Sequence, residues 1–315
     1  MKTPRLQRLL EIALACSLTV AVTAVLARAE SPKHLERGLA LVDEITAAQK
    51  NGVFTGDVGG TTVFLNRYGG SWNSATDASF IRFFDATNGT YAANYTTCSP
   101  LVTHLLKSTY GWDWKQVAIP DPLNNNTPVS PASPKSYLYG TAIKQQIGFA
   151  THVTSLFDVL PGDIAARWET PGDEGHTMIV VSVNFDSPKT YPSTPTDTNW
   201  VPALGGAKYY EVTVLDSSAS GHSNDTRYIT YNGKTGLSGG AGTGVIGVFV
   251  NAAGEVLAHT WSLPTSAYLG VKSNGTPYVT SGWLSGIKSR LRTQVGDAEL
   301  VFGRLPALTP LPGVP

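Results

Sequence analysis

The chain has 315 residues, of which 23 are basic and 23 acidic, so its formal net charge is zero and only 15% of its residues are charged. It shows no basic patch of the kind that binds nucleic acid, and no acidic tail. The 32 glycines and 20 prolines indicate a loop-rich globular protein of the mostly β or α+β kind.

Residues 1–29 have the pattern of a cleavable signal peptide. Three basic residues precede an apolar stretch at 12–26, and Ala27-Arg28-Ala29 matches a small-x-small cleavage site. We predict cleavage after Ala29 and a secreted, periplasmic or cell-envelope location. An uncleaved N-terminal anchor is the alternative. No later segment is apolar enough to span a membrane, so the mature chain is expected to have no membrane span.

Two helices are predicted in the first half of the chain. Ser31-Pro32 resembles a helix start, and apolar residues at helical spacing follow over 32–49. A second apolar stripe begins at Cys98 and ends at Gly111. The intervening and following patterns predict short strands or loops over 53–75, a helical stretch over 78–86, a long loop at 119–136 and a helix over 142–149.

From residue 157 onward the apolar residues alternate with a strand period. The predicted strands follow the turn Pro161-Gly162-Asp163 and then occupy 177–185, 209–216, 244–251 and 256–261. A Pro-rich excursion at 186–202 interrupts them. Helices first and strands later predict an α+β fold, in which N-terminal helices, including the Cys-bearing helix, pack on an antiparallel sheet. We expect one domain over 30–305 and a Pro-rich tail at 306–315.

Cys98 is the single cysteine of the predicted mature chain and stands at the start of a predicted helix. Backbone N–H groups and the positive end of the helix dipole favour a thiolate at such a position. A thiolate is a nucleophile for acyl transfer. Exported proteins usually pair their cysteines, so an unpaired thiol is either reactive or a small buried hydrophobic group.

A catalytic thiolate needs a base, which is usually a histidine. His176 precedes the predicted strand 177–185, and Asp216 ends the strand 209–216. Antiparallel pairing of these strands would bring Asp216 beside His176, where it would orient the ring. His222, in a loop near Asp216, is a rival base or a substrate ligand. The remaining histidines have weaker positions for this role: His34, His104, His152 and His259.

Four segments in this order resemble the NlpC-type papain-like cysteine peptidases, a superfamily of cell-wall amidases and endopeptidases. They are Cys98-Ser99 at a helix start, VLPGDIAAR, GHTMIVVSV, and a strand that ends at Asp216. The resemblance covers roughly residues 90–217. It implies a papain-like fold with Cys98 as nucleophile, His176 as base and Asp216 as the third member of a triad.

The chain also departs from the family pattern. The family commonly has Asp-Cys-Ser-Gly where this chain has Thr97-Cys98-Ser99-Pro100. The stretch Tyr68-Gly69-Gly70 resembles one that the family places close before its cysteine, but here it lies far upstream. The segment HSNDTR, residues 222–227, has no assignable counterpart. We expect these departures to affect the choice of substrate more than the triad.

Acyl transfer further requires an oxyanion hole. The backbone N–H of Cys98 is one candidate donor, and the resemblance implies a tyrosine hydroxyl upstream, for which we favour Tyr91 over Tyr95. Ordinary aromatic packing is the alternative for both. Trp168 and Trp200 lie in or beside loops that flank the catalytic strands, so they are candidate substrate-binding residues together with His222.

These features predict an exported cysteine hydrolase that cuts an amide bond through an acyl-enzyme, without a cofactor. The resemblance implies peptidoglycan stem peptides as substrate, although another amide would serve. The alternatives are a catalytically idle wall-binding or structural protein on the same fold, and a non-hydrolytic acyltransferase with the same triad. A metal site built from Cys98, His176 and Asp216 or His222 is a further reading, but the chain lacks the closely spaced ligand pairs of zinc sites.

Overall fold

The computed structural model describes residues 31–58, 61–70, 72, 78–167, 175–191, 204–263, 269–271, 277–279 and 299–314. Lys33–Pro315 form one compact unit. The predicted signal peptide lies outside the described residues, as do Trp168 and Trp200. None of the described helices is both long and apolar enough to cross a membrane.

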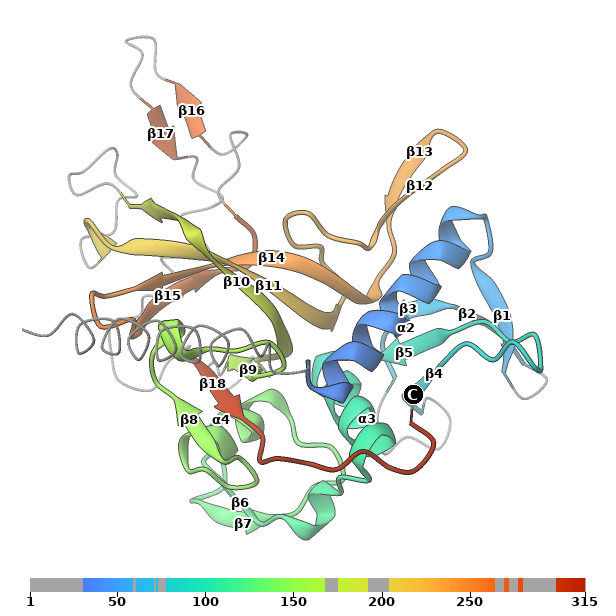
Figure 1. Cartoon of the computed structure of the whole chain (residues 1–315), viewed down its shortest axis with the longest axis horizontal. Helices are drawn as coiled ribbons and strands as arrows, with labels where there is room; N and C mark the ends of the chain where they lie inside the picture. Colours follow the sequence, from blue (N-terminus) through green and yellow to red (C-terminus); the bar gives the residue numbers. More distant parts are fainter. Residues whose placement is uncertain are drawn as a thin grey trace, which may run out of the picture. The chain divides into compact units, whose positions relative to one another are not determined.

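A seven-stranded antiparallel sheet organises this unit (Figure 1). Its strands are, in spatial order, β15 (Val256–Thr260), β14 (Gly240–Val250), β11 (Lys208–Ser218), β10 (His176–Thr190), β9 (Ile164–Arg167), β18 (Leu300–Arg304) and β8 (Thr151–Val153). The long strands β10, β11 and β14 are neighbours in the sheet, although the hairpin β12–β13 separates β11 from β14 along the chain. The C-terminal strand β18 pairs between β8 and β9, so the end of the chain completes the sheet.

The two faces of the sheet follow from the strand period of two. On one face, Ile179 of β10 and Leu215 of β11 belong to the larger apolar cluster, which also contains helix residues. On the other face, Met178, Val180 and Val214 belong to a second cluster. A strand buried on both faces reads as a continuous apolar run, which explains the unbroken stretch in GHTMIVVSV.

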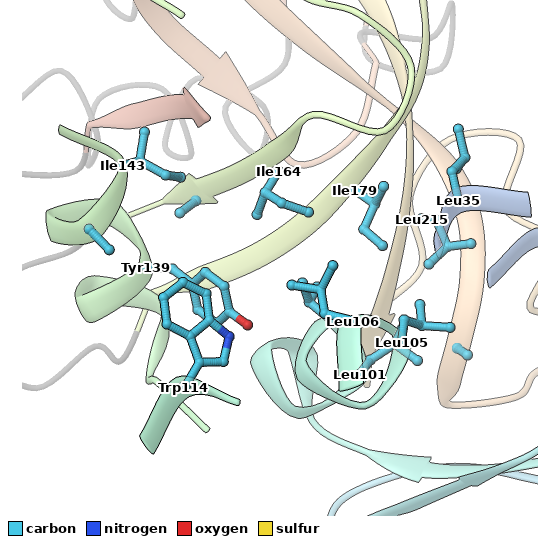
Figure 2. Packing of buried hydrophobic residues seen from close by; sticks show 14 of the residues in the cluster. Leu35, Leu101, Leu105, Leu106, Trp114, Tyr139, Ile143, Ile164, Ile179 and Leu215 are labelled. Atoms are coloured by element: carbon cyan, nitrogen blue, oxygen red, sulfur yellow. The ribbon is translucent and has the colours of Figure 1, made fainter. Parts of the chain in front are cut away.

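Three α-helices occur among the described residues: α2 (Lys33–Lys50), α3 (Cys98–Tyr110) and α4 (Ser136–Lys144). Leu101, Leu105 and Leu106 of α3 are fully buried and pack in the same cluster as Ile179 and Leu215 (Figure 2). This packing fixes α3 on β10 and β11, and therefore fixes the position of the cysteine at its first residue. Two short 3-10 helices lie at Trp114–Gln116 and Leu156–Asp158.

Smaller β elements surround the main sheet. A three-stranded sheet has the order β3 (Asn66–Tyr68), β5 (Ala93–Thr96) and β4 (Phe80–Arg82), and its β3–β5 pair is parallel. Four antiparallel pairs are β1–β2 (Thr55–Val58, Thr61–Phe64), β6–β7 (Ile119–Asp121, Thr127–Val129), β12–β13 (Tyr228–Tyr231, Lys234–Leu237) and β16–β17 (Leu269–Val271, Pro277–Val279). Asn66 joins the small sheet to β14 through two hydrogen bonds with the backbone of Ala241, both 2.8 Å long.

The predicted α+β, papain-like fold with N-terminal helices is wrong. The described part of the chain is mostly β, with 40% strand, 21% helix and three α-helices. The strands β1 to β5 separate α2 from α3, so these two helices do not form a continuous N-terminal helical region; β1 to β3 lie where short strands or loops were predicted. They are only three or four residues long, too short to show a strand period in a Gly-rich sequence.

Several predicted elements also differ in detail. Residues 78–86 contain strand β4 in place of a helical stretch; β4 pairs with β5, Phe80 packs against Tyr95, and Phe84 is exposed. The predicted loop 119–136 carries the hairpin β6–β7, which turns through Asn125 and Asn126 with positive φ. The helix expected over 142–149 occupies Ser136–Lys144. Strand β10 extends to Thr190, into the first residues of the predicted excursion 186–202.

Other elements are confirmed. The helix predicted over 32–49 is α2, and the helix predicted from Cys98 is α3, which ends at Gly111 with a φ of 70°. The turn before β9 is held by Asp163, which accepts hydrogen bonds from the Leu160 N–H at 2.9 Å and from Arg304 of β18 at 2.8 and 3.0 Å. The end of the tail packs back on α3, since the Leu311 N–H donates to the Thr109 carbonyl at 2.8 Å.

Candidate functional site

Cys98 is the first residue of α3 and is a free, buried cysteine. The preceding residue, Thr97, has an extended backbone and makes no side-chain cap to the helix. The first-turn N–H groups are thus not capped by Thr97, and Pro100 contributes no N–H at all. A sulfur at this position lies at the positive end of the helix dipole, which favours its anionic form.

Three neighbours surround the sulfur. The Ser136 hydroxyl lies 3.5 Å from Sγ, and the His176 side chain and the Thr177 backbone N–H are near enough to stabilise its anionic form. Burial alone would raise the pKa of the Cys98 thiol. The charge of His176 and these hydrogen bonds outweigh burial and lower the pKa to about 7.

Ser136 is oriented by a second hydroxyl. Thr177 Oγ1 donates to Ser136 Oγ at 2.8 Å, so the Ser136 hydroxyl is left to donate its own proton to the Cys98 sulfur. Ser136 is also the first residue of α4. The sequence analysis did not identify this serine, because it ends a long loop whose path depends on tertiary packing.

His176 is the first residue of β10 and follows Gly175, a position that only glycine can occupy. Gly175 has a φ of +73°, and a Cβ there would overlap the carbonyl oxygen of Arg167 on β9. His176 pairs with Arg167 in the β10–β9 ladder, which fixes the backbone of the histidine. The Gly-His pair of the sequence thus has a physical reason.

His176 and Asp216 lie together. Ile179 pairs with Leu215, so the start of β10 lies beside the end of β11, and His176 Nε2 is 2.5 Å from Asp216 Oδ2. Since Nε2 is engaged by the carboxylate, Nδ1 is the nitrogen left for the Cys98 thiol. Burial lowers the pKa of His176, but the thiolate charge and the Asp216 hydrogen bond raise it to about 9.

Asp216 has two further partners from the segment that had no counterpart in the resemblance. His222 Nε2 lies 3.0 Å from Asp216 Oδ2, and Arg227 Nη2 lies 3.1 Å from Oδ1. Burial would raise the pKa of Asp216. The charges of His222 and Arg227, and the hydrogen bonds from His176 and His222, hold that pKa well below its usual range.

Trp261 covers both histidine rings. Its ring centroid lies 4.8 Å from that of His176 in an edge arrangement and 4.3 Å from that of His222. The indole therefore shields the hydrogen bonds to Asp216 on this side. Trp261 follows the end of β15, and only the distant pairing of β14 with β15 brings it here. No local signal in the sequence could have identified it.

The other predicted site residues have different surroundings. Tyr91 has 41% of its surface exposed, whereas Tyr95 lies in β5 and packs against Phe80 and below the Arg67 guanidinium. Their role as oxyanion donors remains a prediction. Trp168 and Trp200 fall outside the described residues. The side chain of His222 has no exposed surface, so a bound substrate cannot contact it in this conformation.

The upstream Tyr-Gly-Gly stretch lies close to the cysteine after all. Tyr68 of β3 pairs in parallel with Thr96 of β5, and the Gly69 N–H donates to the Thr96 carbonyl at 3.2 Å. Thr96 stands two residues before Cys98. A segment about 30 residues upstream is therefore a structural neighbour of the helix that carries the thiol.

A metal ion fits this cluster poorly. His176, Asp216 and His222 offer three ligand atoms within 4.8 Å of one another. Zinc bonds of about 2.1 Å in tetrahedral geometry separate two ligands by roughly 3 Å or more. The 2.5 Å between His176 Nε2 and Asp216 Oδ2 is that of a hydrogen bond, and Arg227 beside the same carboxylate would repel a cation.

Comparisons with known proteins do not identify a function for this site. No family model matches the chain, and no solved structure matches it. An uncharacterized protein of Acanthamoeba polyphaga mimivirus, R653, is 26% identical over 183 residues, which cover 56% of this chain and 72% of that protein. This similarity assigns neither a family nor an activity.

Proposed function

We propose that the protein is a cysteine hydrolase that cleaves an amide bond, with Cys98 as nucleophile and His176 as base. The proposal is supported by His176, which lies 2.5 Å from Asp216 and whose charge, with nearby hydrogen bonds, lowers the pKa of Cys98 to about 7 while its own pKa rises to about 9. Between these two values the favoured state is a thiolate beside an imidazolium.

The reaction follows from that ion pair. The thiolate attacks the carbonyl carbon, and His176 then donates its proton to the leaving nitrogen as the C–N bond breaks. A thioester to Cys98 remains. His176, now neutral, takes a proton from water, whose oxygen attacks the thioester, and the thiolate leaves with the histidine protonated again. Asp216 holds the ring in one orientation and stabilises its charged form.

Developing negative charge on the substrate oxygen needs donors. The backbone N–H of Cys98 at the start of α3 is a candidate, supported by the absence of a side-chain cap from Thr97. A tyrosine hydroxyl, Tyr91 or Tyr95, is the second donor implied by the resemblance to the NlpC-type peptidases. This proposal concerns the chemistry of that family and not its fold, since the fold described above is mostly β.

Peptidoglycan stem peptides are the substrate class that we propose. Two sequence features support it: the signal-peptide pattern of residues 1–29, which indicates export, and the resemblance over residues 90–217. The free thiol also suits a protein that uses its cysteine for reaction, because exported proteins usually pair a cysteine that they do not use.

Digestion of peptidoglycan tests the proposal. Purified mature protein and the variant Cys98→Ser are incubated with muropeptides, and new amine and carboxyl termini are identified by mass spectrometry. We expect cleavage by the wild type only, rising as the pH passes about 7 and falling above about 9. Equal cleavage by Cys98→Ser would contradict Cys98 as the nucleophile. No cleavage of muropeptides or of general peptide amides would favour a binding role.

A further inference from the structure

The segment 219–227 folds into a tight loop whose centre is Asp225. The Asp225 carboxylate accepts from the His222 N–H at 2.6 Å and from the Arg227 N–H at 2.8 Å, and forms two bonds with the Arg227 guanidinium at 2.6 and 2.8 Å. The loop is fastened to β14, where the Val245 N–H donates to the Ser223 carbonyl at 2.8 Å. The side chains of His222 and Arg227 are therefore held in fixed positions.

Two glycines of β14 leave space for the side chains of His222 and Arg227. A Cβ at Gly244 would lie 2.6 Å from the Cβ of His222, and a Cβ at Gly242 would lie 2.6 Å from Cγ of Arg227. Any other residue at either position would displace the loop. The small residues of GAGTG, 240–244, thus accommodate the histidine and the arginine against Asp216.

Both ring nitrogens of His222 face oxygen atoms that can only accept. Nδ1 lies 2.6 Å from the Trp261 carbonyl, and Nε2 lies 3.0 Å from the Asp216 carboxylate. A neutral imidazole has only one N–H and could satisfy only one of these contacts. A ring that donates from both nitrogens would satisfy both contacts, and its side chain has no exposed surface.

Other charged groups surround His222 and Asp216. Arg227 is a buried cation that pairs with both Asp216 and Asp225. Arg167, which is also buried, pairs with His176 in the β10–β9 ladder and lies 5.9 Å from the centre of the Trp261 ring. Buried charges are favourable only when they are paired, so the orientation of Asp216 depends on these neighbours.

We propose that His222 is a positioning residue that donates from both ring nitrogens, fixes Asp216 toward His176, and favours the thiolate through its positive charge. The inference rests on the proposed function, because it assigns a role within the same ion pair. The titratable and charged groups around His222 are Asp216 of β11, Asp225 and Arg227 of its own loop, His176 of β10, which shares the Asp216 carboxylate, and Arg167 of β9, which lies over the Trp261 ring.

Alkylation of Cys98 by iodoacetamide across pH tests this role in the full mature chain. His222→Gln retains an amide that can donate to Asp216 but removes the charge. We expect the midpoint of the alkylation rate to move upward by about one pH unit, since a nearby cation is lost. His34→Gln is the matched control: His34 is also buried and bonds a carbonyl, that of Gly162, and its midpoint should not move.

The outcomes separate the two proposals. A rate that falls equally at every pH, with an unchanged midpoint, overturns the role of His222 and leaves the ion pair standing. A wild-type midpoint near the ordinary thiol value of about 8.5 overturns the ion pair and this inference together.

A measurement on the wild type keeps the test independent of whether His222→Gln folds. Nitrogen NMR of labelled histidines at about pH 8 should show two rings with both nitrogens protonated, and loss of one of these signals in His176→Gln assigns the other to His222. A singly protonated His222 overturns the proposal. Tight binding of added zinc ions with the loss of both signals would also overturn it, in favour of a metal site.

Discussion

Two buried carboxylates of this protein have different surroundings. Asp163 accepts from the N–H of Leu160 in its own turn and from Arg304, whose side chain is 34% exposed. Asp216 is paired with His176, His222 and Arg227, and its side chain has no exposed surface. The first carboxylate fastens a turn to a strand. Asp216 contacts His176, which in turn lowers the pKa of the Cys98 thiol, so the charge of Asp216 affects the protonation of both groups.

The comparison suggests that ion pairs with similar partners serve different purposes. An arginine and a backbone N–H satisfy the Asp163 carboxylate locally. The Asp216 carboxylate is shared by two histidines and an arginine, and one of these histidines lowers the pKa of the Cys98 thiol. We therefore expect substitutions at Asp163 and Arg304 to change stability alone, and substitutions around Asp216 to change stability and thiol chemistry together.

The largest effect is expected for Asp216→Asn. The change leaves His222 and Arg227 buried without their shared counter-charge, so the free energy of unfolding should fall by about 3–5 kcal/mol in urea titrations. The exposed Asp186→Asn should be neutral. Unchanged stability in Asp216→Asn would contradict the charge cluster.

The loss of unfolding free energy in Asp216→Asn should depend on pH in a specific way. The folded-state pKa of Asp216 lies well below the ordinary 3.8. Its contribution to stability is therefore complete above the unfolded pKa and disappears only as the pH falls through the lower folded value. The stability difference between wild type and Asp216→Asn should stay constant from about pH 5 to neutrality and shrink in stronger acid.

His176→Ala is expected to have the next largest effect. Without the imidazolium, burial dominates and raises the pKa of Cys98 from about 7 to the ordinary value or above. At about pH 6 the thiolate fraction, and with it the rate of alkylation by iodoacetamide, should fall by about 10²-fold. An alkylation rate at this pH that does not depend on His176 would show that the histidine does not activate the thiol.

Arg304→Met should break the other carboxylate's ion pair. Asp163 would remain buried with one charged partner removed, which should cost about 1–3 kcal/mol of unfolding free energy. Arg304→Lys, which retains the charge, should cost less. Neither variant should alter the pH dependence of alkylation, and a shift in that profile would mean that the two carboxylates are coupled.

The smallest effect is expected for Ser136→Ala. Loss of one hydroxyl donor to sulfur should raise the pKa of Cys98 and lower alkylation at about pH 6 by about threefold to tenfold. Ser108→Ala on α3 is the control, since that hydroxyl donates to the Leu105 carbonyl. Equal rates in both variants would remove Ser136 from the set of groups that stabilise the thiolate.

The sequence predicted the elements that depend on local patterns. The helices α2, which begins at Lys33 just after Ser31-Pro32, and α3, which begins at Cys98, follow from the helical spacing of their apolar residues. The proximity of His176 and Asp216 follows from antiparallel pairing of two sequential strands. Their catalytic roles stay predictions, as do the export signal and the substrate.

Features that depend on distant pairing were missed. The strands β1 to β5 are too short to show a period of their own and depend on their pairing partners, so the α+β fold was chosen over the mostly β fold that composition also allowed. Ser136 and Trp261 reach the site through α4 and β15. The role of the HSNDTR segment beside Asp216 cannot be predicted from the sequence, because only the folded chain shows that His222 and Arg227 contact Asp216.

The most direct test of the account is the ultraviolet thiolate absorbance of the wild-type protein as a function of pH, with Cys98→Ala subtracted. The account predicts a rise with a midpoint at about 7. A rise only near the ordinary thiol pKa of about 8.5, or above it, would contradict the ion pair of Cys98 and His176 on which the proposed function depends.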